Sequence, residues 1–408
     1  MKKLLVKNIG LLATPEGKSA HRGEEQGKIK FLKDAWVLIE DGTIASVGTG
    51  AVPAVEGAEV VDAEGHLVTP GLVDAHTHLI FGGWRQNELG LKLHGASYLD
   101  IQNAGGGIQS TTNATRQASE QELAAKASKA LDEMMGFGTT TVEAKSGYGL
   151  ATEHELKALE VIKDLNDHHR MDLVATFMGA HLVPAEYKSN REEYVRLVCE
   201  EMMPKVKEQG IAKFCDVFCE ADTFTVEESR QVLEAGLKYG LRPKIHADEI
   251  EAIGGSQLAG EIGAISAEHL IVCPPEGIAS MAKGGVIACL LPATSFNLGA
   301  VFAPARDMVN EGVPVAMATD FNPGSCPCLN MQLVINLGCL RYRLTPEQAL
   351  TAVTLNGAAA ICRADRIGSI EPGKQADLLI WKAENLDYIC YRLGSNLVET
   401  VIKKGDVV

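Results

Sequence analysis

The sequence predicts an α/β fold, in which a (β/α)8 TIM-like barrel carries a small β-sandwich domain formed by the two ends of the chain. Three observations support this fold class. Short apolar runs alternate with longer amphipathic stretches between residues 70 and 365, a pattern typical of β/α repeats around a parallel sheet. Both chain ends contain instead short β-like runs separated by turn residues. The length of 408 residues is enough for two or three domains.

The β-like runs at the two ends define the smaller domain. The first part contains strand candidates at residues 4–12, 35–40 and 43–47, and Asp41 and Gly42 form the tight-turn pair between the last two. The second part contains candidates at residues 376–381 and 398–403. We therefore predict that residues 1–66 and 366–408 fold together as one composite β domain, and that residues 67–365 form the barrel.

Eight strand candidates follow one another in the middle of the chain, at residues 72–75, 139–144, 173–178, 214–218, 243–245, 264–267, 286–291 and 315–318. Amphipathic stretches between them include residues 120–135, 153–165, 191–209 and 225–239. Thr225 and Glu228 have the spacing of a capping box at the start of the last of these stretches. In such a barrel the active site lies at the carboxyl ends of the strands. A doubly wound open sheet is the alternative.

Composition restricts the partners and the compartment. There are 38 basic and 53 acidic residues, which give a net charge of −15, and no basic stripe that could follow a nucleic acid. An anionic ligand would therefore need one or two placed Arg or His side chains. No apolar run approaches the roughly 18 residues of a membrane span, and Lys7 and Asn8 interrupt the first apolar run. The ten cysteines have no framework spacing and none precedes Cys199, so we expect a cytoplasmic protein.

Polar residues at the predicted strand ends indicate a metal site. His76 and His78 follow the first strand and point to the same side of an extended segment. His246 follows the fifth strand and Asp320 the eighth, so both can reach the same position. Three neutral imidazoles and one carboxylate suit Zn²⁺, and the same set also binds Fe²⁺ or Mn²⁺. His269 ends the sixth strand at the same face of the barrel.

The segment Pro70-Gly71-Leu72-Val73-Asp74-Ala75-His76-Thr77-His78, taken with the later His246, His269 and Asp320, resembles the amidohydrolase superfamily of metal-dependent hydrolases. Within it, nearly the whole chain is similar to the imidazolonepropionase family, through residues 104–108, 142–149, 179–181, 246–249 and 320–325. The resemblance implies hydrolysis of the cyclic amide C–N bond of 4-imidazolone-5-propanoate, an anionic substrate. The product would be N-formimidoyl-L-glutamate, in histidine degradation.

The resemblance also implies roles for individual residues. The expected metal ligands are His76, His78, His246 and Asp320, around one transition metal ion, with zinc favoured and iron the alternative. The expected catalytic residues are Glu249, His269 and Asp320, between which the proton-transfer roles stay open. The expected substrate-binding residues are Arg85, Tyr148, His181, Glu249, Asn322, Gly324 and Ser325. The planar fork of Arg85 suits a propanoate carboxylate, although a plain salt bridge would also explain this residue. Residues 322–324 read Asn-Pro-Gly, a turn sequence whatever it binds.

Two other functions remain open from the sequence. Another mononuclear amidohydrolase, such as a purine or pyrimidine aminohydrolase, would need the same metal ligands. A barrel without catalytic activity could serve as an assembly scaffold, but such a protein would be expected to lose ligands. Lys145 could suggest the carboxylated lysine that bridges two metals in some amidohydrolases, but that lysine lies at the end of the fourth strand. The fourth predicted strand of this chain ends in Phe218-Cys219-Glu220. We therefore expect one metal ion. We also expect a homodimer, because homodimers are the commonest oligomers.

Overall fold

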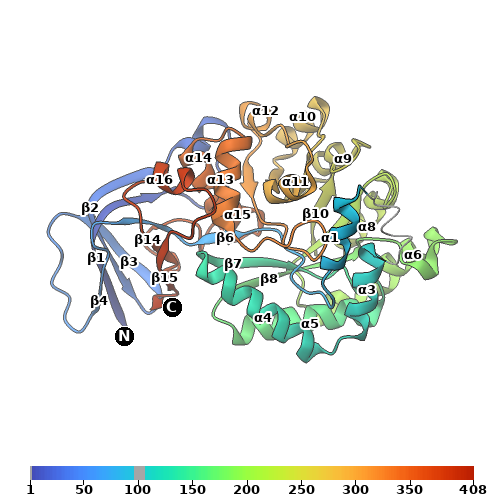
Figure 1. Ribbon diagram of the computed structural model, residues 1–408, viewed down its shortest axis with the longest axis horizontal. Helices are drawn as coiled ribbons and strands as arrows, with labels where there is room; N and C mark the ends of the chain where they lie inside the picture. Colours follow the sequence, from blue (N-terminus) through green and yellow to red (C-terminus); the bar gives the residue numbers. More distant parts are fainter. Residues whose placement is uncertain (1, 96–105) are drawn as a thin grey trace.

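The computed structural model describes residues 2–95 and 106–408, and the described chain forms two sheets, with the helices gathered around the larger one (Figure 1). The larger body is a barrel of eight parallel strands in the spatial order β13-β12-β11-β10-β9-β8-β7-β6. Its strands are β6 (Leu72–Asp74), β7 (Thr139–Lys145), β8 (Asp172–Ala180), β9 (Phe214–Cys219), β10 (Arg242–Ala247), β11 (Ser266–His269), β12 (Ile287–Leu290) and β13 (Val315–Met317). All eight predicted barrel strands are confirmed, with ends that differ by one or two residues in most cases.

The two outer strands of this sheet meet beyond their carboxyl ends. Thr77 and Phe321 form an isolated parallel bridge, the amide of His78 donates to the carbonyl of Phe321 at 2.8 Å, and the amide of Asp320 donates to the carbonyl of His76 at 3.1 Å. These bonds bring the segment after β6 against the segment after β13. The first and last strands of the barrel therefore contribute neighbouring side chains.

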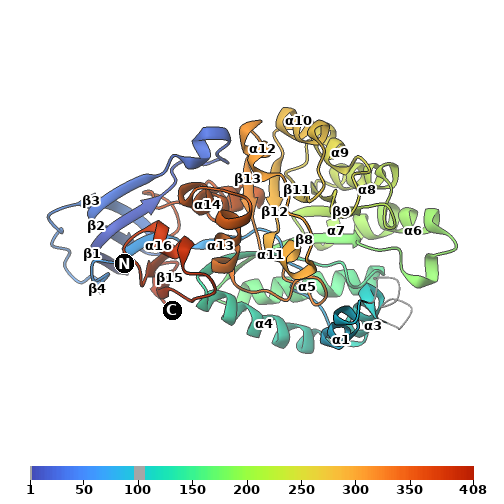
Figure 2. The same ribbon diagram turned by 45° about the horizontal axis from the view of Figure 1, so that its top comes forward.

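Helices cover the outside of the barrel (Figure 2). In chain order they are α1 (Leu89–Leu93), α3 (Gly107–Gln117), α4 (Glu120–Gly136), α5 (Thr152–His168), α6 (Arg191–Leu197), α7 (Met203–Gln209), α8 (Val226–Lys238), α9 (Gly255–Ile262), α10 (Pro275–Gly284), α11 (Pro292–Leu298), α12 (Ala305–Asn310), α13 (Met331–Arg341), α14 (Pro346–Val353), α15 (Leu355–Ala360) and α16 (Leu386–Tyr391). The capping box predicted at Thr225 and Glu228 is present at the start of α8. Within the described ranges, no helix has the length and apolar character needed to cross a membrane.

The stretch predicted as one helix over residues 191–209 contains a break in its hydrogen-bond pattern. Helix α6 passes into a π-helical turn, Val198–Met202, before α7 begins. Pro204 lies in the first turn of α7. Because proline has no amide hydrogen and its ring crowds the carbonyl four residues earlier, the wider π turn accommodates it without ending the helical run.

The smaller body is one mixed sheet made from both chain ends. Its strands are β1 (Lys3–Thr14), β2 (Lys30–Glu40), β3 (Thr43–Thr49), β4 (Glu59–Asp62), β5 (Leu67–Pro70), β14 (Leu378–Trp381), β15 (Val398–Lys403) and β16 (Asp406–Val407). Strand β5 joins the two ends, because it pairs in parallel with β1 and antiparallel with β14. The predicted composite β domain thus has the form of an eight-stranded mixed sheet. The predicted limits at residues 66 and 365 stay a prediction, and β5 itself belongs to the mixed sheet.

A partly buried ion-pair network joins the mixed sheet to the barrel. Asp172 begins β8, and its carboxylate lies 2.8 Å from Nζ of Lys403 at the end of β15 and 2.5 Å from Nζ of Lys404. Asp377 accepts from the same Lys403 at 2.8 Å, and the side-chain amide of Gln375 donates to Asp172 at 2.7 Å. The Lys403 side chain is only 2% exposed. The orientation of the small sheet on the barrel is therefore fixed in part by charge.

Candidate metal centre and active site

Four potential metal-binding atoms converge at the carboxyl end of the barrel. Nε2 of His76 lies 3.4 Å from Oδ1 of Asp320, and Nε2 of His78 lies 3.6 Å from the same oxygen. Nε2 of His246, at the end of β10, lies 3.3 Å from Nε2 of His78. All four side chains are buried. The four residues predicted as ligands are thus brought together by β6, β10 and the loop after β13.

The spacing and the lack of partners fit a bound cation. A tetrahedral ion that binds its ligands at about 2.0–2.1 Å holds them about 3.3–3.4 Å apart, close to the separations found here. Nε2 of His76 and Oδ1 of Asp320 are buried without a hydrogen-bond partner among the described residues, which is costly unless another group satisfies them. The residues therefore fit a metal ion, and the protein is a metal-binding protein.

Carboxylates fix the orientation of two of these imidazoles. Nδ1 of His76 lies 3.0 Å from Oε2 of Glu268, and Nδ1 of His246 lies 3.1 Å from Oδ1 of Asp216. A carboxylate accepts, so Nδ1 carries the hydrogen in both rings and the lone pair on Nε2 faces the cluster. Such partners orient metal-binding histidines and increase their basicity. Glu268 and Asp216 therefore belong to the site although they do not face its centre.

Two buried lysines neutralise these carboxylates from inside the barrel. Nζ of Lys145 lies 2.8 Å from both Glu143 and Asp216, and Nζ of Lys244 lies 3.1 Å from Glu268. Burial alone would lower the pKa of Lys145, but Asp216 and Glu143 raise it above the ordinary value. This lysine is therefore charged and held by ion pairs. Such a position differs from that of a lysine bridging two metals.

Three of the imidazoles, those of His76, His78 and His269, are neutral in this environment. Burial lowers the pKa of His76, His78 and His269 well below the ordinary value of 6.5, and the neighbouring histidines and Lys145 lower it further. Neutral imidazole is the form that binds metals. Burial raises the pKa of Asp320 to about 6 despite a hydrogen bond from Thr294. Oγ1 of Thr294 donates to Oδ2 at 2.6 Å, so Oδ1 remains directed at the histidines.

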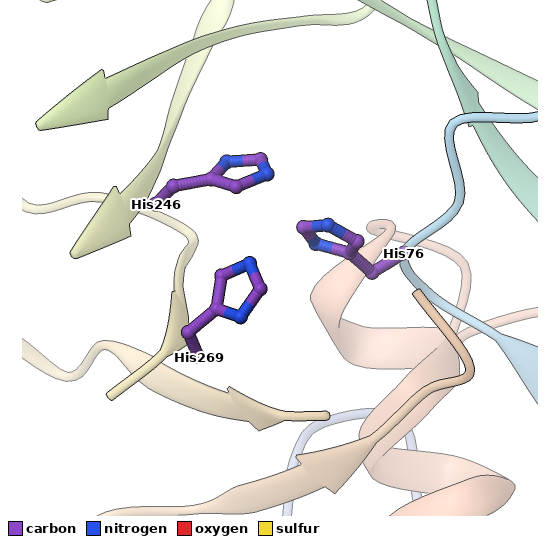
Figure 3. Close-up of side chains that lie close together, drawn as sticks. All are labelled: His76, His246 and His269. Atoms are coloured by element: carbon purple, nitrogen blue, oxygen red, sulfur yellow. The ribbon is translucent and has the colours of Figure 1, made fainter. Parts of the chain in front are cut away.

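His269 and Glu249 lie beside the cluster, as the sequence predicts. Figure 3 shows the rings of His76, His246 and His269 turned toward one another from separate segments, and the three could also share a cation. Nε2 of His269 lies 3.6 Å from Oε2 of Glu249, whose side chain is 13% exposed. Burial, reinforced by the charges of Asp320 and Glu220, raises the pKa of Glu249 to about 8. Glu249 can therefore hold a proton near neutral pH.

Backbone strain is concentrated at two of these residues. His269 has φ +67° and Asp320 has φ +58°, in the left-handed region that side chains other than glycine rarely adopt. Each such residue costs on the order of 1 kcal/mol or more and persists only where its surroundings impose it. The imposed conformation turns both side chains out of the strand direction and into the site.

Arg85 lies against the loop that follows Asp320 and already has an acidic partner. Its Nε and Nη2 donate to the two oxygens of Glu88 at 2.8 and 2.9 Å, and the Arg85 and Glu88 side chains are 10% and 2% exposed. The guanidinium covers Gly324, where an added Cβ would lie 2.1 Å from Nη1. Arg85 is thus a largely buried, oriented cation beside the loop that follows Asp320. The spacing of three residues between Arg85 and Glu88 is the sequence signal for their pairing.

Tyr148 and His181 line another side of the cluster. The His181 ring stacks on that of His78, with centroids 4.8 Å apart and planes 21° apart, and the Tyr148 ring centroid lies 5.1 Å from that of His181. Both side chains are buried. Burial lowers the pKa of His181 to about 3. A neutral His181 therefore presents a polar but uncharged edge.

Asn322 and Ser325 are engaged in the turn after Asp320. Oδ1 of Asn322 accepts from the amides of Gly324 and Ser325 at 2.8 and 2.7 Å, and its Nδ2 donates to the Asp320 carbonyl at 2.7 Å and to the Ser325 hydroxyl at 2.9 Å. The turn interpretation of this segment therefore holds. A contact of these side chains with substrate stays a prediction. Of the glycine segment at residues 104–108, Ala104 and Gly105 lie outside the described residues.

The sequence interpretation missed the acidic residues that support the site. They are Glu88, Glu143, Glu155, Asp216, Glu220 and Glu268. The available signal was the presence of carboxylates inside or just after buried strands, as at Asp216 in β9 and Glu268 in β11. A buried carboxylate is rarely tolerated without a partner. The pattern could have identified these positions, although it could not have assigned their partners.

A barrel with a histidine and aspartate metal site of this kind is the architecture of a metal-dependent hydrolase. The model of the amidohydrolase family matches residues 67–408. The chain therefore belongs to the amidohydrolase family. Solved structures agree in fold: atrazine chlorohydrolase from Arthrobacter aurescens TC1, complexed with zinc, is 18% identical with a TM-score of 0.74 and covers 99% of this chain and 94% of its own. Guanine deaminase from C. acetobutylicum, with bound guanine, is 17% identical with a TM-score of 0.71 and full coverage of both chains.

Curated relatives define the branch of the family. Imidazolonepropionase of Alkaliphilus metalliredigens is 51% identical over 414 residues, which cover 100% of this chain and 98% of the relative. Imidazolonepropionase of Geobacillus kaustophilus is 50% identical over 416 residues, with the same coverage. Within the amidohydrolases, the chain therefore belongs to the imidazolonepropionases.

Proposed function

We propose that the protein hydrolyses the cyclic amide C–N bond of 4-imidazolone-5-propanoate and releases N-formimidoyl-L-glutamate, a step of histidine degradation. Full-length relatives at about half identity support this assignment. The observation that carries it is the position of Arg85, an oriented and mostly buried cation covering Gly324 beside the candidate metal ligands. An anionic tail and a hydrolysable ring could therefore be held together in one site.

His76, His78, His246 and Asp320 would hold the metal ion. When bound there, a divalent transition metal lowers the pKa of water from 15.7 toward about 7 and so supplies a nucleophile at neutral pH. The role of Glu268 and Asp216 is to keep Nε2 of His76 and of His246 directed at the ion. Lys145 and Lys244 stabilise the ionised form of both carboxylates.

The chain's own acids and bases would then move the protons. Asp320 accepts a proton from the attacking water, because its Oδ1 faces the site while Thr294 occupies Oδ2. The new C–O bond forms at the ring carbonyl carbon, and the C–N bond of the same carbon breaks. Glu249 delivers a proton to the leaving ring nitrogen, a role suited to a carboxyl group that is protonated near neutral pH. His269 donates a hydrogen bond to the oxyanion that develops on the carbonyl oxygen.

Substrate recognition would be divided between two sides of the site. Arg85 binds the propanoate carboxylate with the donors that Glu88 does not use. Tyr148 and His181 contact the ring, and the turn from Asn322 to Ser325 lies next to Asp320 at the edge of the site. This arrangement provides local positive charge in a protein whose net charge is −15. The attraction of an anionic substrate would thus depend on Arg85 and on the metal, since the overall charge opposes it.

Zinc is the metal that this ligand set favours, and iron is the alternative. Three imidazoles and one carboxylate suit both ions. Elemental analysis of protein purified without chelator is the direct test, and an ion other than these two at full occupancy would contradict the proposal. A metal content below about half an equivalent would instead favour a scaffold without catalytic activity.

The function itself is tested with the purified protein and two kinds of substrate. We expect consumption of imidazolonepropanoate and formation of formimidoylglutamate, with no deamination of guanine or cytosine. Rapid deamination of a neutral base together with inertness toward the imidazolone would support the aminohydrolase alternative. We also infer a cytoplasmic location, since all ten cysteines are free of disulfides. The homodimer stays an expectation that light scattering can check.

A further inference from the structure

Two buried glutamates each bind the backbone of a loop that carries a candidate active-site residue. The first is Glu155, in the first turn of α5. Its Oε1 accepts from the amides of Gly149 and Leu150, both at 2.8 Å, and its Oε2 accepts from the amide of Gly147 at 2.9 Å. The Glu155 residue is fully buried. Three amides around Tyr148 are therefore held by one carboxylate.

The second is Glu220, immediately after β9. Its Oε2 accepts from the amides of Glu249 and Ile250 at 3.1 and 2.9 Å, and its Oε1 accepts from the amide of Glu251 at 3.0 Å. Glu220 is 2% exposed. The loop held here is the one that carries Glu249. The same arrangement thus occurs twice, on different strands and at different loops.

Both loops contain backbone conformations that need such support. Leu150 and Asp248 each have φ +51°, which is unfavourable for residues with a side chain. A carboxylate that accepts two or three amide hydrogens forms charge-assisted bonds, which are stronger than bonds between neutral groups. Through their hydrogen bonds to backbone amides, the two glutamates therefore anchor the loops at the points where the backbone is strained.

The loop that Glu155 binds also contacts the ring of His181. Nδ1 of His181 lies 2.9 Å from the carbonyl oxygen of Gly147. Because a carbonyl can only accept, Nδ1 carries the hydrogen and Nε2 is left as an acceptor toward the site. Gly147 therefore makes both contacts: its amide donates to Glu155, and its carbonyl accepts from His181. The loop held by Glu155 therefore carries Tyr148 and also hydrogen-bonds to His181.

We propose that Glu155 and Glu220 are positioning residues with separate functions: Glu155 holds Tyr148 and His181 for substrate recognition, and Glu220 holds Glu249 for proton transfer. The proposal rests on the proposed hydrolysis of the imidazolone ring. Neither glutamate contacts the metal cluster through a bond in the described structure, so each acts through its loop. A purely structural role would change stability alone, whereas positioning predicts different kinetic effects for the two residues.

The kinetic test compares E155Q and E220Q in the metal-loaded protein. Glutamine keeps the size of the side chain, but its NH₂ group cannot accept a hydrogen bond from a backbone amide. Each variant therefore loses the hydrogen bonds made by one of the two carboxylate oxygens. We expect E155Q to raise KM at least about fivefold with kcat within about twofold of wild type. We expect E220Q to lower kcat by about ten- to a hundredfold with a smaller change in KM. Kinetic constants within about twofold of wild type for both variants would overturn the proposal.

Matched controls remove a carboxylate charge from the neighbourhood of each site. E153Q alters the same helix turn as Glu155, at a side chain that is 82% exposed, and D222N alters an exposed residue two positions after Glu220. Both controls should keep wild-type kcat and KM. If either glutamine variant fails to fold, E155D or E220D takes its place, because the shorter acid keeps the charge and should change the same kinetic constant less strongly.

Amide hydrogen exchange gives a readout that is independent of activity. E155Q should accelerate exchange at residues 147, 149 and 150 and leave residues 249–251 unchanged, and E220Q should do the reverse. Unchanged exchange at the loop of each altered glutamate would contradict the assigned contacts. Failure of the proposed function is distinguishable from this outcome, because wild-type protein would then leave imidazolonepropanoate intact while the exchange pattern still reported on the loops.

Discussion

The guanidinium of Arg85 lies directly over the Cα of Gly324, so closely that a Cβ at this glycine would be 2.1 Å from Nη1 and 2.5 Å from Cζ. Glu88 holds the opposite edge of the same guanidinium through two hydrogen bonds. The cation is therefore fixed between a carboxylate and a bare stretch of backbone. This pairing explains why a glycine is needed four residues after the candidate ligand Asp320, even though Gly324 has no left-handed φ.

Gly324→Ala should displace Arg85 without altering the metal ligands. Because the new methyl group would occupy the position of the guanidinium, we expect KM for imidazolonepropanoate to rise by about tenfold or more, which corresponds to about 1.4 kcal/mol or more. The kcat should change less. Gly136→Ala is the control, since nothing lies within 4 Å of a Cβ at that helix end. Steady-state kinetics would contradict the argument if both variants behaved alike.

Arg85→Ala should weaken binding of substrate through the carboxylate alone. Hydrogen bonds to charged groups contribute about 1.5–3 kcal/mol, so KM should rise by roughly ten- to a hundredfold while kcat changes little. A substrate analogue without the carboxylate provides the control, because wild type and variant should turn it over equally well. An equal loss with both compounds would assign Arg85 a structural role through Glu88.

His246→Ala should remove the metal and the activity together. The variant loses one of four converging atoms and leaves Asp216 without its imidazole partner. We expect less than about half an equivalent of metal by elemental analysis, since a site with three remaining ligands is open and binds more weakly. His168→Ala, at a side chain that is 76% exposed, should retain both. Retention of metal or activity in His246→Ala would refute the proposed ligand set.

The ion pair at Asp172 should make stability depend on pH in acid. Burial alone would raise the pKa of Asp172, but Lys403, Lys404 and Gln375 lower it from 3.8 to about 2. The folded protein therefore takes up this proton less readily than the unfolded chain, and the stabilisation is complete above a pH of about 4 and is lost as the pH falls toward about 2. The shift corresponds to about 2 kcal/mol.

Asp172→Asn should accordingly lower the free energy of unfolding by about 2 kcal/mol at pH 7, and the difference from wild type should shrink as the pH falls below about 4. Denaturant unfolding over this pH range is the measurement. Asp167→Asn removes an exposed pair with Lys163 on α5, for which we expect less than about 0.5 kcal/mol. A difference for Asp172→Asn that stays constant down to pH 3 would show that packing, and not charge, is responsible.

The local sequence pattern was sufficient to predict the order of the barrel strands and the candidate metal ligands. Short apolar runs separated by amphipathic stretches predicted all eight barrel strands, and the His-X-His sequence after the first of them provided two of the candidate ligands that the fold brings together. Both signals are local: strand and helix periodicity extend over a few residues, and parallel strands in a barrel place their carboxyl ends at one face. The composite β domain was also readable, because both ends of the chain have the same short strands.

Only the tertiary structure decided which residues support the site. Glu268 faces His76 across 192 positions of sequence and Asp216 faces His246 across 30, and no local pattern specifies such a pairing. Glu155 and Glu220 likewise bind loops through backbone amides, which every sequence offers equally. The contact of Arg85 with Gly324 depends on closure of the barrel between β6 and β13. The sequence alone determined the kinds of residues at the strand ends. Packing decided their partners, because a buried charge is stable only beside groups that the fold brings to it.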